Sequence, residues 1–260
     1  ADNPNAIIGR TLLGDLYIKC NRPELALTEY RIAVGIKPDA YPVWKQLLLI
    51  TYKEELWDTL INVSASCQAL FPVQPMPFLT MAIARNKKGD LDEAEKAIEI
   101  GSGLIVTNDP ATEAEFDFQR GVLALNRNEL MKAKGWFMHS ISLQPENYEL
   151  KADITNESMS TPALLPFADS LLNECVSFDP SNAKFMAIKG RNYYVKNDLL
   201  LANSWIEKAI IHGYPKKLGE EWLGDCAFRA GDLQRAKYYW LNAVSLGNQT
   251  ERLKQKLNKL

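Results

Sequence analysis

The stretch LGDCAFRAGDLQRA, from Leu223 to Ala236, follows the same pattern as LGDLYIKCNRPELA, from Leu13 to Ala26. Both stretches open with Leu-Gly-Asp and close with an alanine at the same spacing. A cysteine beside an aspartate could be part of a reactive site, or the two stretches could be copies of one structural unit. The spacing of residues along the rest of the chain favours the second interpretation, because the same pattern recurs many times.

The pattern becomes visible when positions are counted toward the N-terminus from a residue at the end of each unit. Small residues stand 5, 12 and 24 positions before Pro38, and an aromatic residue stands 8 positions before it. The same offsets recur before Pro145, Tyr214 and Asn248, with the large aliphatic Ile206 at the aromatic position before Tyr214, and more loosely before Pro72, Pro110 and Pro180. A fixed period of this length is the signature of a repeat architecture. We expect seven units of about 34 residues, at residues 6–39, 40–73, 75–110, 112–146, 148–181, 182–215 and 217–248.

Each unit divides into two amphipathic segments around a polar break such as KKGDLD, NRNE or RAGDLQ. Apolar residues recur at helical spacing on both sides of the break, for example Leu12 and Leu16, and strand-like alternation is absent. Small residues at fixed positions let two helices approach closely. A proline at the end of a unit stops its second helix, and Thr161 before Pro162 predicts a helix N-cap. The sequence therefore predicts an all-α array of helix pairs.

The last residues, QTERLKQKLNKL, carry Leu253, Leu257 and Leu260 at helical spacing among polar and basic residues. This pattern predicts a capping helix over 249–260, which would cover the last apolar face of the array. The segments FPVQPMP and ADITNESMSTP are places where the stacking is expected to bend, but both are too short to link domains. We therefore expect a single domain over residues 1–260.

Composition excludes several classes of function. Of the 260 residues 47% are hydrophobic, which is enough for a substantial core. Thirty basic and thirty-two acidic residues leave a formal net charge of −2, so no global field attracts nucleic acid. The apolar runs stop well short of the ~20 residues that cross a bilayer. The sequence predicts neither a nucleic-acid partner nor a transmembrane segment.

The residues that carry chemistry are sparse. With two histidines, His139 and His212, the chain has no HExxH motif, and no Gly-rich phosphate loop occurs. Cys67 and Cys175 stand five residues before terminal prolines, where other units carry small residues, so we interpret them as buried packing residues. Cys20 and Cys226 are the remaining candidates for a reactive thiol. We predict no catalytic, cofactor-binding or metal-binding residues, and hence no enzyme.

The ladder of glycine, alanine, aromatic residue, alanine and proline, from about Ala6 to Asn248, resembles the tetratricopeptide repeat, or TPR. The resemblance covers nearly the whole chain. It implies an α-solenoid, a superhelix of about seven helix-turn-helix repeats whose first helices line a concave groove. Pro4 resembles the terminal proline of a preceding repeat, so the sequence predicts a fragment of a longer array.

In TPR proteins the groove binds partner peptides or domains, and counting along the first helices identifies the residues expected to face it. The middle of the predicted groove is apolar and its C-terminal part mixes aromatic and basic residues. Such residues supply much of the binding energy at interfaces, although several could instead pack against neighbouring repeats. The predicted groove residues are Lys45, Tyr52, Met76, Leu79, Ile83, Phe118, Val122, Arg191, Tyr194, Trp222 and Arg229.

The carboxylate clamp of chaperone-binding TPR proteins uses Lys, Asn and Arg at inward positions. The matching N-terminal positions in this chain hold other residues, so a chaperone-clamp function is not expected. The positions concerned are Thr11, Asp15, Gln46, Met76 and Thr80.

Two functional hypotheses follow from the resemblance. The first is a noncatalytic scaffold that binds a protein or peptide partner. The order of repeat units in the chain, including the stretch QPMPFLTMAIARNKKGDLDEAEKAIEIG, resembles that of exported TPR proteins of the Gram-negative cell envelope. This resemblance implies an assembly or secretion accessory in the periplasm. The alternative is the regulatory region of a longer enzyme or signalling protein whose catalytic domain lies upstream of Ala1, with a cytoplasmic location as the alternative compartment.

Overall fold

The computed structural model describes residues 4–106, 108–248 and 250–259. Fifteen α-helices and one short 3-10 helix form within these residues, and no strand occurs among them. The prediction of an all-α fold is therefore confirmed. Contacts divide the chain into two compact units, unit 1 (Ala1–Gln144) and unit 2 (Pro145–Leu260). The expectation of a single continuous domain stays a prediction.

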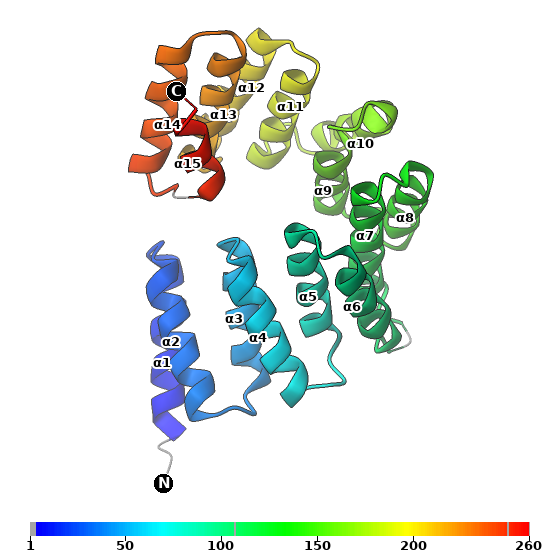
Figure 1. Cartoon of the computed structure of the whole chain (residues 1–260), viewed down its shortest axis with the longest axis vertical. Helices are drawn as coiled ribbons and strands as arrows, with labels where there is room; N and C mark the ends of the chain where they lie inside the picture. The colour runs from blue at the N-terminus through cyan, green and yellow to red at the C-terminus, as the bar shows by residue number, and fades with distance from the viewer. Residues whose placement is uncertain (1–3, 107, 249, 260) are drawn as a thin grey trace. The chain divides into compact units, whose positions relative to one another are not determined.

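Unit 1 consists of four helix pairs, each a first helix packed against the second helix that follows it (Figure 1). Each second helix also contacts the first helix of the next pair, so the pairs stack in chain order. The pairs are α1 (Pro4–Lys19) with α2 (Pro23–Ile36), α3 (Tyr41–Lys53) with α4 (Trp57–Leu70), α5 (Pro75–Lys88) with α6 (Leu91–Gly103), and α7 (Pro110–Asn126) with α8 (Leu130–Leu143).

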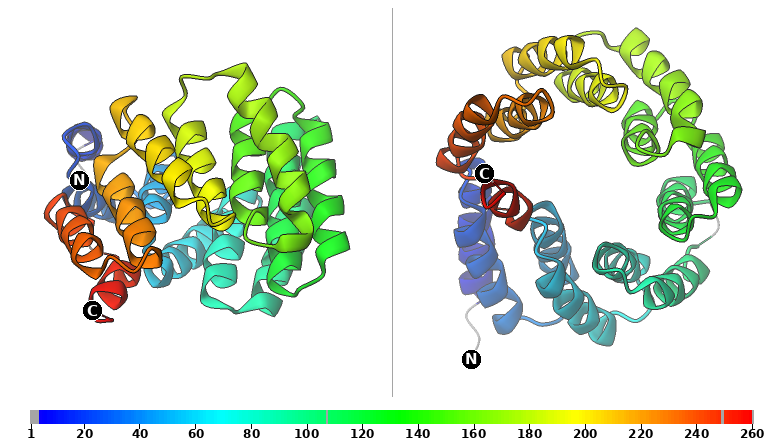
Figure 2. Two further views of the ribbon diagram at one scale, coloured as in Figure 1. Left: turned by 90° about the horizontal axis from the view of Figure 1, so that it is seen from above. Right: turned by 45° about the horizontal axis from the view of Figure 1, so that its top comes forward.

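Unit 2 contains three more pairs and a closing helix (Figure 2). Seven pairs followed by a C-terminal helix, counted over the described residues, confirm the predicted α-solenoid of TPR type. The elements are α9 (Tyr148–Ser158), η1 (Pro162–Leu164) and α10 (Leu165–Phe178), then α11 (Ala183–Val195) with α12 (Leu199–Ile211), α13 (Lys216–Arg229) with α14 (Leu233–Ser245), and α15 (Glu251–Leu257).

The turns inside the pairs share one backbone geometry. In six of the seven pairs a residue with positive φ ends the first helix, and the next amide donates to a carbonyl five residues earlier, as Asp90 N does to Arg85 O at 2.9 Å. This is the Schellman ending, which favours glycine or asparagine because other side chains are strained there. The residues with positive φ are Asn21, Glu55, Gly89, Asn128, Asn197 and Gly231.

The pair α9–α10 turns differently. Its polar break SMSTP leads into the short 3-10 helix η1, which begins at Pro162. Thr161 has the extended backbone expected of a residue before proline, but its side chain makes no capping hydrogen bond. Thr161 is thus the N-cap residue before Pro162, as predicted, but of a 3-10 helix, and its carbonyl rather than its side chain accepts from Leu164 N at 2.9 Å.

Small residues set the closeness of the two helices in a pair. A methyl group placed on Gly121 would lie 2.4 Å from the ring of Phe137, and one on Gly224 would lie 2.3 Å from Trp240. These distances are below van der Waals contact, so the aromatic ring occupies the space that the glycine leaves. In α3–α4 the sizes are exchanged: Leu48 stands at the glycine position and Ser64 at the aromatic position, both fully buried.

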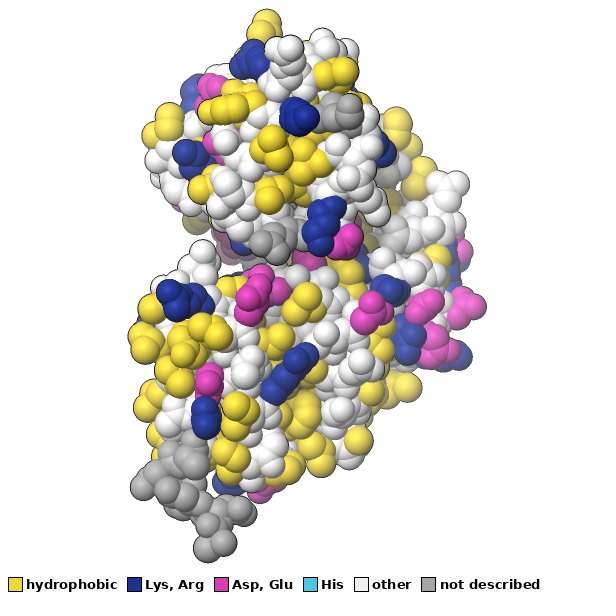
Figure 3. All heavy atoms as spheres, turned by 60° about the vertical axis from the view of Figure 1, so that its left-hand side comes forward, with side chains coloured by type: hydrophobic (Ala, Val, Ile, Leu, Met, Phe, Trp, Pro, Cys, Tyr) yellow, Lys and Arg dark blue, Asp and Glu magenta, His cyan; other side chains and the backbone are white. Residues whose placement is uncertain are grey.

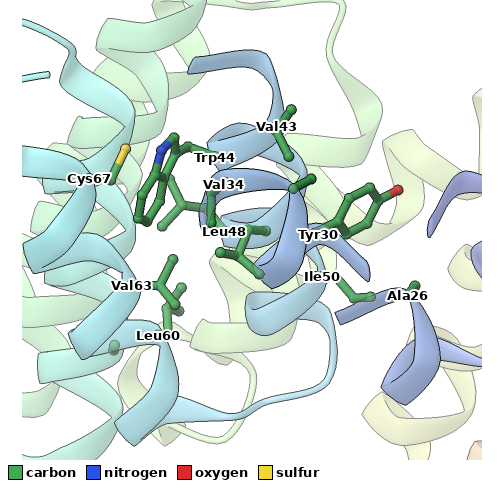
Figure 4. Packing of buried hydrophobic residues seen from close by; sticks show 13 residues of the cluster. Ala26, Tyr30, Val34, Val43, Trp44, Leu48, Ile50, Leu60, Val63 and Cys67 are labelled. Atoms are coloured by element: carbon green, nitrogen blue, oxygen red, sulfur yellow. The ribbon is translucent and has the colours of Figure 1, made fainter. Parts of the chain in front are cut away.

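The core of unit 1 shows how neighbouring pairs join. Trp44 of α3, Val34 of α2 and Cys67 of α4 are buried in one cluster that spans two pairs (Figure 4). The indole Nε1 of Trp44 donates to the Pro38 carbonyl at 2.9 Å, and the Tyr30 hydroxyl donates to Asp15 Oδ1 at 2.6 Å. The polar ends of these large side chains are thus satisfied while their rings fill the interior.

Successive first helices also contact one another: α3 with α5 and α5 with α7 in unit 1, and α9 with α11 and α11 with α13 in unit 2. We call the side of each unit that its first helices line the inner side. Side chains from different repeats meet on the inner side, so a site that combines several repeats is expected there.

The apolar side chains of the first and last helices differ in exposure. On α1 the side chains of Ile8, Leu12 and Leu16 are 53–62% exposed, and hydrophobic side chains are visible at the surface over the N-terminal helices (Figure 3). On α15, by contrast, Leu253 is fully buried against Trp240 and its neighbours and Leu257 packs beside it. Leu260, the third leucine of the predicted cap, lies outside the described residues.

The closing helix is also held by charge. The buried carboxylate of Glu221 on α13 accepts hydrogen bonds from Arg252 Nε at 2.9 Å, Lys256 Nζ at 2.6 Å and Asn248 Nδ2 at 2.8 Å. Burial alone would raise the pKa of Glu221, but the bonds from Lys256 and Arg252 outweigh it and hold that pKa below its ordinary value. Glu221 thus stays ionised and fixes α15 on α13.

Candidate interaction surface

The inner side of unit 2 brings together four of the predicted groove residues. Arg191 and Tyr194 lie on α11, and Trp222 and Arg229 lie on α13, the next first helix. The guanidinium carbon of Arg191 is 5.3 Å from the ring centre of Trp222, whose indole meets the Tyr194 ring edge-on at 5.6 Å. We call these four residues the α11–α13 surface.

Arg229 closes the other end of this arrangement. Its guanidinium carbon lies 3.6 Å from the centre of the Tyr194 ring, and Nη1 donates to the Tyr194 carbonyl at 2.6 Å. The two rings therefore lie next to each other between the two cations, in the order Arg191, Trp222, Tyr194, Arg229. Burial raises the pKa of Tyr194, so its hydroxyl remains protonated. Flat rings and guanidinium planes present large contact area with few torsions to fix, which suits them to binding.

Arg191 differs from the other cations of unit 2. Its Nε is buried and has no hydrogen-bond partner among the described residues. Lys184, by comparison, binds Glu149 Oε2 and Asp153 Oδ1, both at 2.7 Å, and Arg252 binds Glu221. Burial lowers the pKa of Arg191, and Arg252 adds to this effect, while Tyr214, Glu157 and Asp153 oppose it. The Arg191 guanidinium therefore carries a desolvation cost that its stacking on Trp222 offsets only in part.

The predicted groove residues of unit 1 lie on the inner helices α3, α5 and α7, but their environments differ. Lys45 and Tyr52 are exposed on α3: Lys45 Nζ is 5.8 Å from the Tyr41 ring centre, and the Tyr52 ring is 6.3 Å from that of Trp57. Both therefore contact residues of their own pair.

The α5 and α7 residues are more buried. Met76 and Leu79 pack against hydrophobic clusters, and Ile83 is half-buried. Phe118 is half-buried with its ring 6.0 Å from that of Phe137, and Val122 is only 4% exposed. Val122 is thus a packing residue, and the accessible part of this side consists of the half-buried side chains.

Sequence reasoning missed a polar cluster between α6, α7 and α8. The buried carboxylate of Asp117 binds Arg120 Nη1 and His139 Nδ1, each at 2.6 Å, and Arg120 Nη2 donates to Ser102 Oγ at 2.6 Å. The sequence analysis considered His139 only in excluding the HExxH motif and did not predict this bond. Asp117 is separated from His139 by a turn and a change of helix, so no local motif in the sequence indicates the pair.

A cavity of about 300 Å³ lies next to this cluster. It lies between the second helices α6 and α8, and Glu95, Arg120, Arg127 and Trp136 are among its lining residues. Arg127 already binds Asp92 and Glu95, each at 2.8 Å, and Arg120 binds Asp117. Since its arginines are engaged with carboxylates of the chain, the cavity offers little free positive charge to a ligand.

The cysteines behave as packing residues where they are buried. Cys67 and Cys175 are fully enclosed, as predicted, and burial raises the pKa of the Cys67 thiol to about 12 and that of Cys175 to about 11. Cys226 is also buried, with its pKa raised by burial to about 12. Thiols with such pKa values are protonated at neutral pH and are poor nucleophiles. Cys20 is exposed.

No group of three or more His, Cys, Asp or Glu side chains within the described residues is arranged to hold a metal ion. None of the helices in the described part of the chain is both long enough and apolar enough to cross a bilayer.

Comparison with known proteins supports the fold. The structure is similar to a tetratricopeptide repeat protein from Parabacteroides merdae, with a TM-score of 0.64 at 15% sequence identity over 98% of both chains. It is also similar to a chain of the APC/C hetero-tetramer Cut9-Hcn1, with a TM-score of 0.50 at 14% identity over 99% of this chain and 43% of that one. No protein-family model and no curated protein matches the sequence. At these identities the likeness establishes a TPR fold.

Proposed function

We propose that this chain is a noncatalytic scaffold that binds a segment of another protein on the inner side of its first helices. The observation that carries the proposal is the α11–α13 surface, where two aromatic rings and two guanidinium groups from adjacent repeats form one contiguous contact face. Aromatic and arginine side chains dominate the energetics of protein interfaces. The protonated thiols of Cys67, Cys175 and Cys226 also favour binding over catalysis.

Unit 1 has a separate, more apolar candidate surface of its own. Its accessible residues are Lys45 and Tyr52 on α3, with the half-buried side chains of α5 and α7. An apolar surface of this kind suits an extended or helical segment with apolar residues, and the α11–α13 surface of unit 2 suits one with acidic residues. We further propose a role as an assembly or secretion accessory in the cell envelope, which rests on the resemblance of the sequence to exported TPR proteins.

The proposal is tested by capturing the partner from the native host with the purified chain and comparing matched variants. Trp222→Ala removes an inner aromatic residue, whereas Tyr238→Ala removes an aromatic residue that is 62% exposed on the second helix α14. We expect Trp222→Ala to reduce capture more than about tenfold, because an interface aromatic is worth roughly 2 kcal/mol, and Tyr238→Ala to retain it. Circular dichroism checks that both variants stay folded.

Phe118→Glu tests the contribution of unit 1 in the same assay. A carboxylate at this half-buried position would disrupt an apolar docking surface, and we expect it to abolish capture while the helical circular-dichroism signal persists. Retained capture would remove Phe118 and its neighbour Ile83 from the site. Equal capture by wild type, Trp222→Ala and Phe118→Glu would contradict an inner binding surface altogether.

A further inference from the structure

The Arg191 side chain has a buried hydrogen-bond donor without an acceptor. Among the described residues it forms no ion pair, and its buried Nε has no hydrogen-bond partner. A guanidinium has five N–H donors and is always charged in proteins. A buried charge without a partner is costly, and the cost falls when an anion binds it. The carboxylates of Glu157 and Asp153 act on Arg191 electrostatically, but neither forms an ion pair with it. Arg191 therefore has a physical reason to bind a further anionic group at contact distance.

The surroundings of Arg191 define the shape of that anionic group. The guanidinium carbon of Arg191 lies over the Trp222 ring, 5.3 Å from its centre. Tyr214 lies within electrostatic range, and burial raises the pKa of its phenol, so that its hydroxyl is a hydrogen-bond donor. A planar acceptor with two oxygens matches the fork of an arginine best, and carboxylates form such bidentate pairs.

We propose that Arg191 binds a carboxylate of the partner segment, supplied by an aspartate or glutamate side chain. Its aliphatic neighbours in the segment would lie on the rings of Trp222 and Tyr194. This inference rests on the proposed function, and it narrows the partner to a segment in which an acidic residue is flanked by apolar ones. Charge complementarity is the argument: Lys184 and Arg252 already bind carboxylates of this chain, and Arg191 does not.

The test uses the full chain labelled with ¹⁵N and follows the Nε–H resonance of Arg191 by NMR. The resonance is assigned as the one that disappears in Arg191→Lys. The probe is a blocked pentapeptide with one glutamate between two leucines, and its controls carry glutamine or phosphoserine in place of the glutamate. We expect a saturable shift of the Arg191 Nε–H signal with the glutamate peptide and none with the glutamine peptide.

Variants of Arg191 distinguish recognition by the planar guanidinium from attraction by a positive charge alone. Arg191→Gln should abolish binding of the glutamate peptide, and Arg191→Lys should weaken it about tenfold, since lysine keeps the charge but lacks the planar fork. Arg235→Gln is the matched control, because Arg235 stacks on Tyr239 of the second helix α14 at 5.9 Å; we expect unchanged binding. Two results would overturn the proposal. The first is no shift of the Nε–H signal at glutamate-peptide concentrations up to about 10 mM, since binding weaker than this is too weak to matter. The second is a shift with the phosphoserine peptide alone.

Failure here is distinguishable from failure of the proposed function. If Trp222→Ala loses partner capture while Arg191→Gln keeps it, the scaffold stands and the carboxylate site falls. If Trp222→Ala keeps capture, the proposed surface itself fails, whatever the peptide experiment gives.

Discussion

Val122 in unit 1 and Arg191 in unit 2 occupy the same repeat position, directly after the glycine of a first helix, yet they do different things. Val122 is enclosed by its neighbours, whereas Arg191 stacks on Trp222 and keeps unpaired donors. Tyr52 and Tyr194 are likewise equivalent, four residues after Leu48 and Gly190. Tyr52 meets Trp57 of its own pair, and Tyr194 meets Trp222 and Arg229 of the next pair.

The comparison teaches that a repeat position does not fix a role. What decides it is the size and chemistry of the side chains on the adjacent first helix. In unit 1 Val122 is enclosed by its neighbours and acts as a packing residue, whereas Lys45 and Tyr52 remain exposed. In unit 2 the adjacent residues are aromatic and cationic, so the inner positions form a contact face. We therefore expect most of the binding energy at the α11–α13 surface of unit 2, and a mainly stabilising contribution from Val122 in unit 1.

The largest expected effect comes from exchanging the two residues at the shared position. Val122→Arg places a guanidinium in an apolar site and should cost on the order of 3 kcal/mol or more of unfolding free energy. Arg191→Val removes a desolvated, unpaired charge and should be close to neutral for stability. Urea unfolding followed by circular dichroism measures both. Equal destabilisation by the two substitutions would contradict the assignment of packing to one and recognition to the other.

A smaller effect is expected from Glu221, which holds α15 on α13 beside the α11–α13 surface. Glu221→Gln keeps the shape but removes the charge that binds Arg252 and Lys256, and should cost about 2 kcal/mol. Glu221 and the two cations that it binds all lie in unit 2. We therefore expect Glu221→Gln to leave the stability of unit 1 unchanged.

The pH dependence of this effect has a definite sign. Because the pKa of Glu221 is lower in the folded protein than in the unfolded chain, its contribution is complete above the ordinary glutamate pKa of about 4.3. It is lost as the pH falls through the lower, folded pKa. The stability difference between wild type and Glu221→Gln should therefore be largest near neutral pH and shrink below about pH 4. A difference that grows in acid would contradict the account.

The smallest expected effect concerns two cations that lie over tyrosine rings. Arg229 lies 3.6 Å from the Tyr194 ring centre, whereas Lys45 lies 5.8 Å from that of Tyr41. Arg229→Gln should lower the unfolding free energy by about 1 kcal/mol, and Lys45→Gln by less than about 0.5 kcal/mol. Thermal unfolding of the two variants under identical conditions checks the order. A larger loss for Lys45→Gln would show that the unit 2 arrangement is not the tighter one.

Much of the fold could be predicted because it is determined by local spacing. The glycine-to-aromatic offset that links Gly121 to Phe137 and Gly224 to Trp240 is a contact within one pair. The same reasoning placed Cys67 and Cys175 in the core. The residues of the α11–α13 surface were identified by counting along first helices, which is again a local operation.

Other features depend on residues that lie apart in the sequence. Counting alone put Val122 among the groove residues, but the packing of adjacent helices encloses it. The pattern also made Leu12 and Leu16 look like packing residues, whereas they are exposed on α1, where no helix covers them in the structure. The Asp117–His139 bond joins two helices through side-chain geometry that no periodicity records. That Arg191 Nε lacks a hydrogen-bond partner depends on how the surrounding helices place its neighbours, which a sequence pattern does not reveal.

The central claim is that recognition takes place on the inner side, chiefly at α11 and α13. Hydrogen exchange of the full chain, measured by mass spectrometry with and without the captured partner, tests it most directly. The account predicts slowed exchange in peptides covering α11 and α13, with smaller changes in α3, α5 and α7. Slowed exchange confined to the second helices, such as α6, α8 and α14, would contradict it.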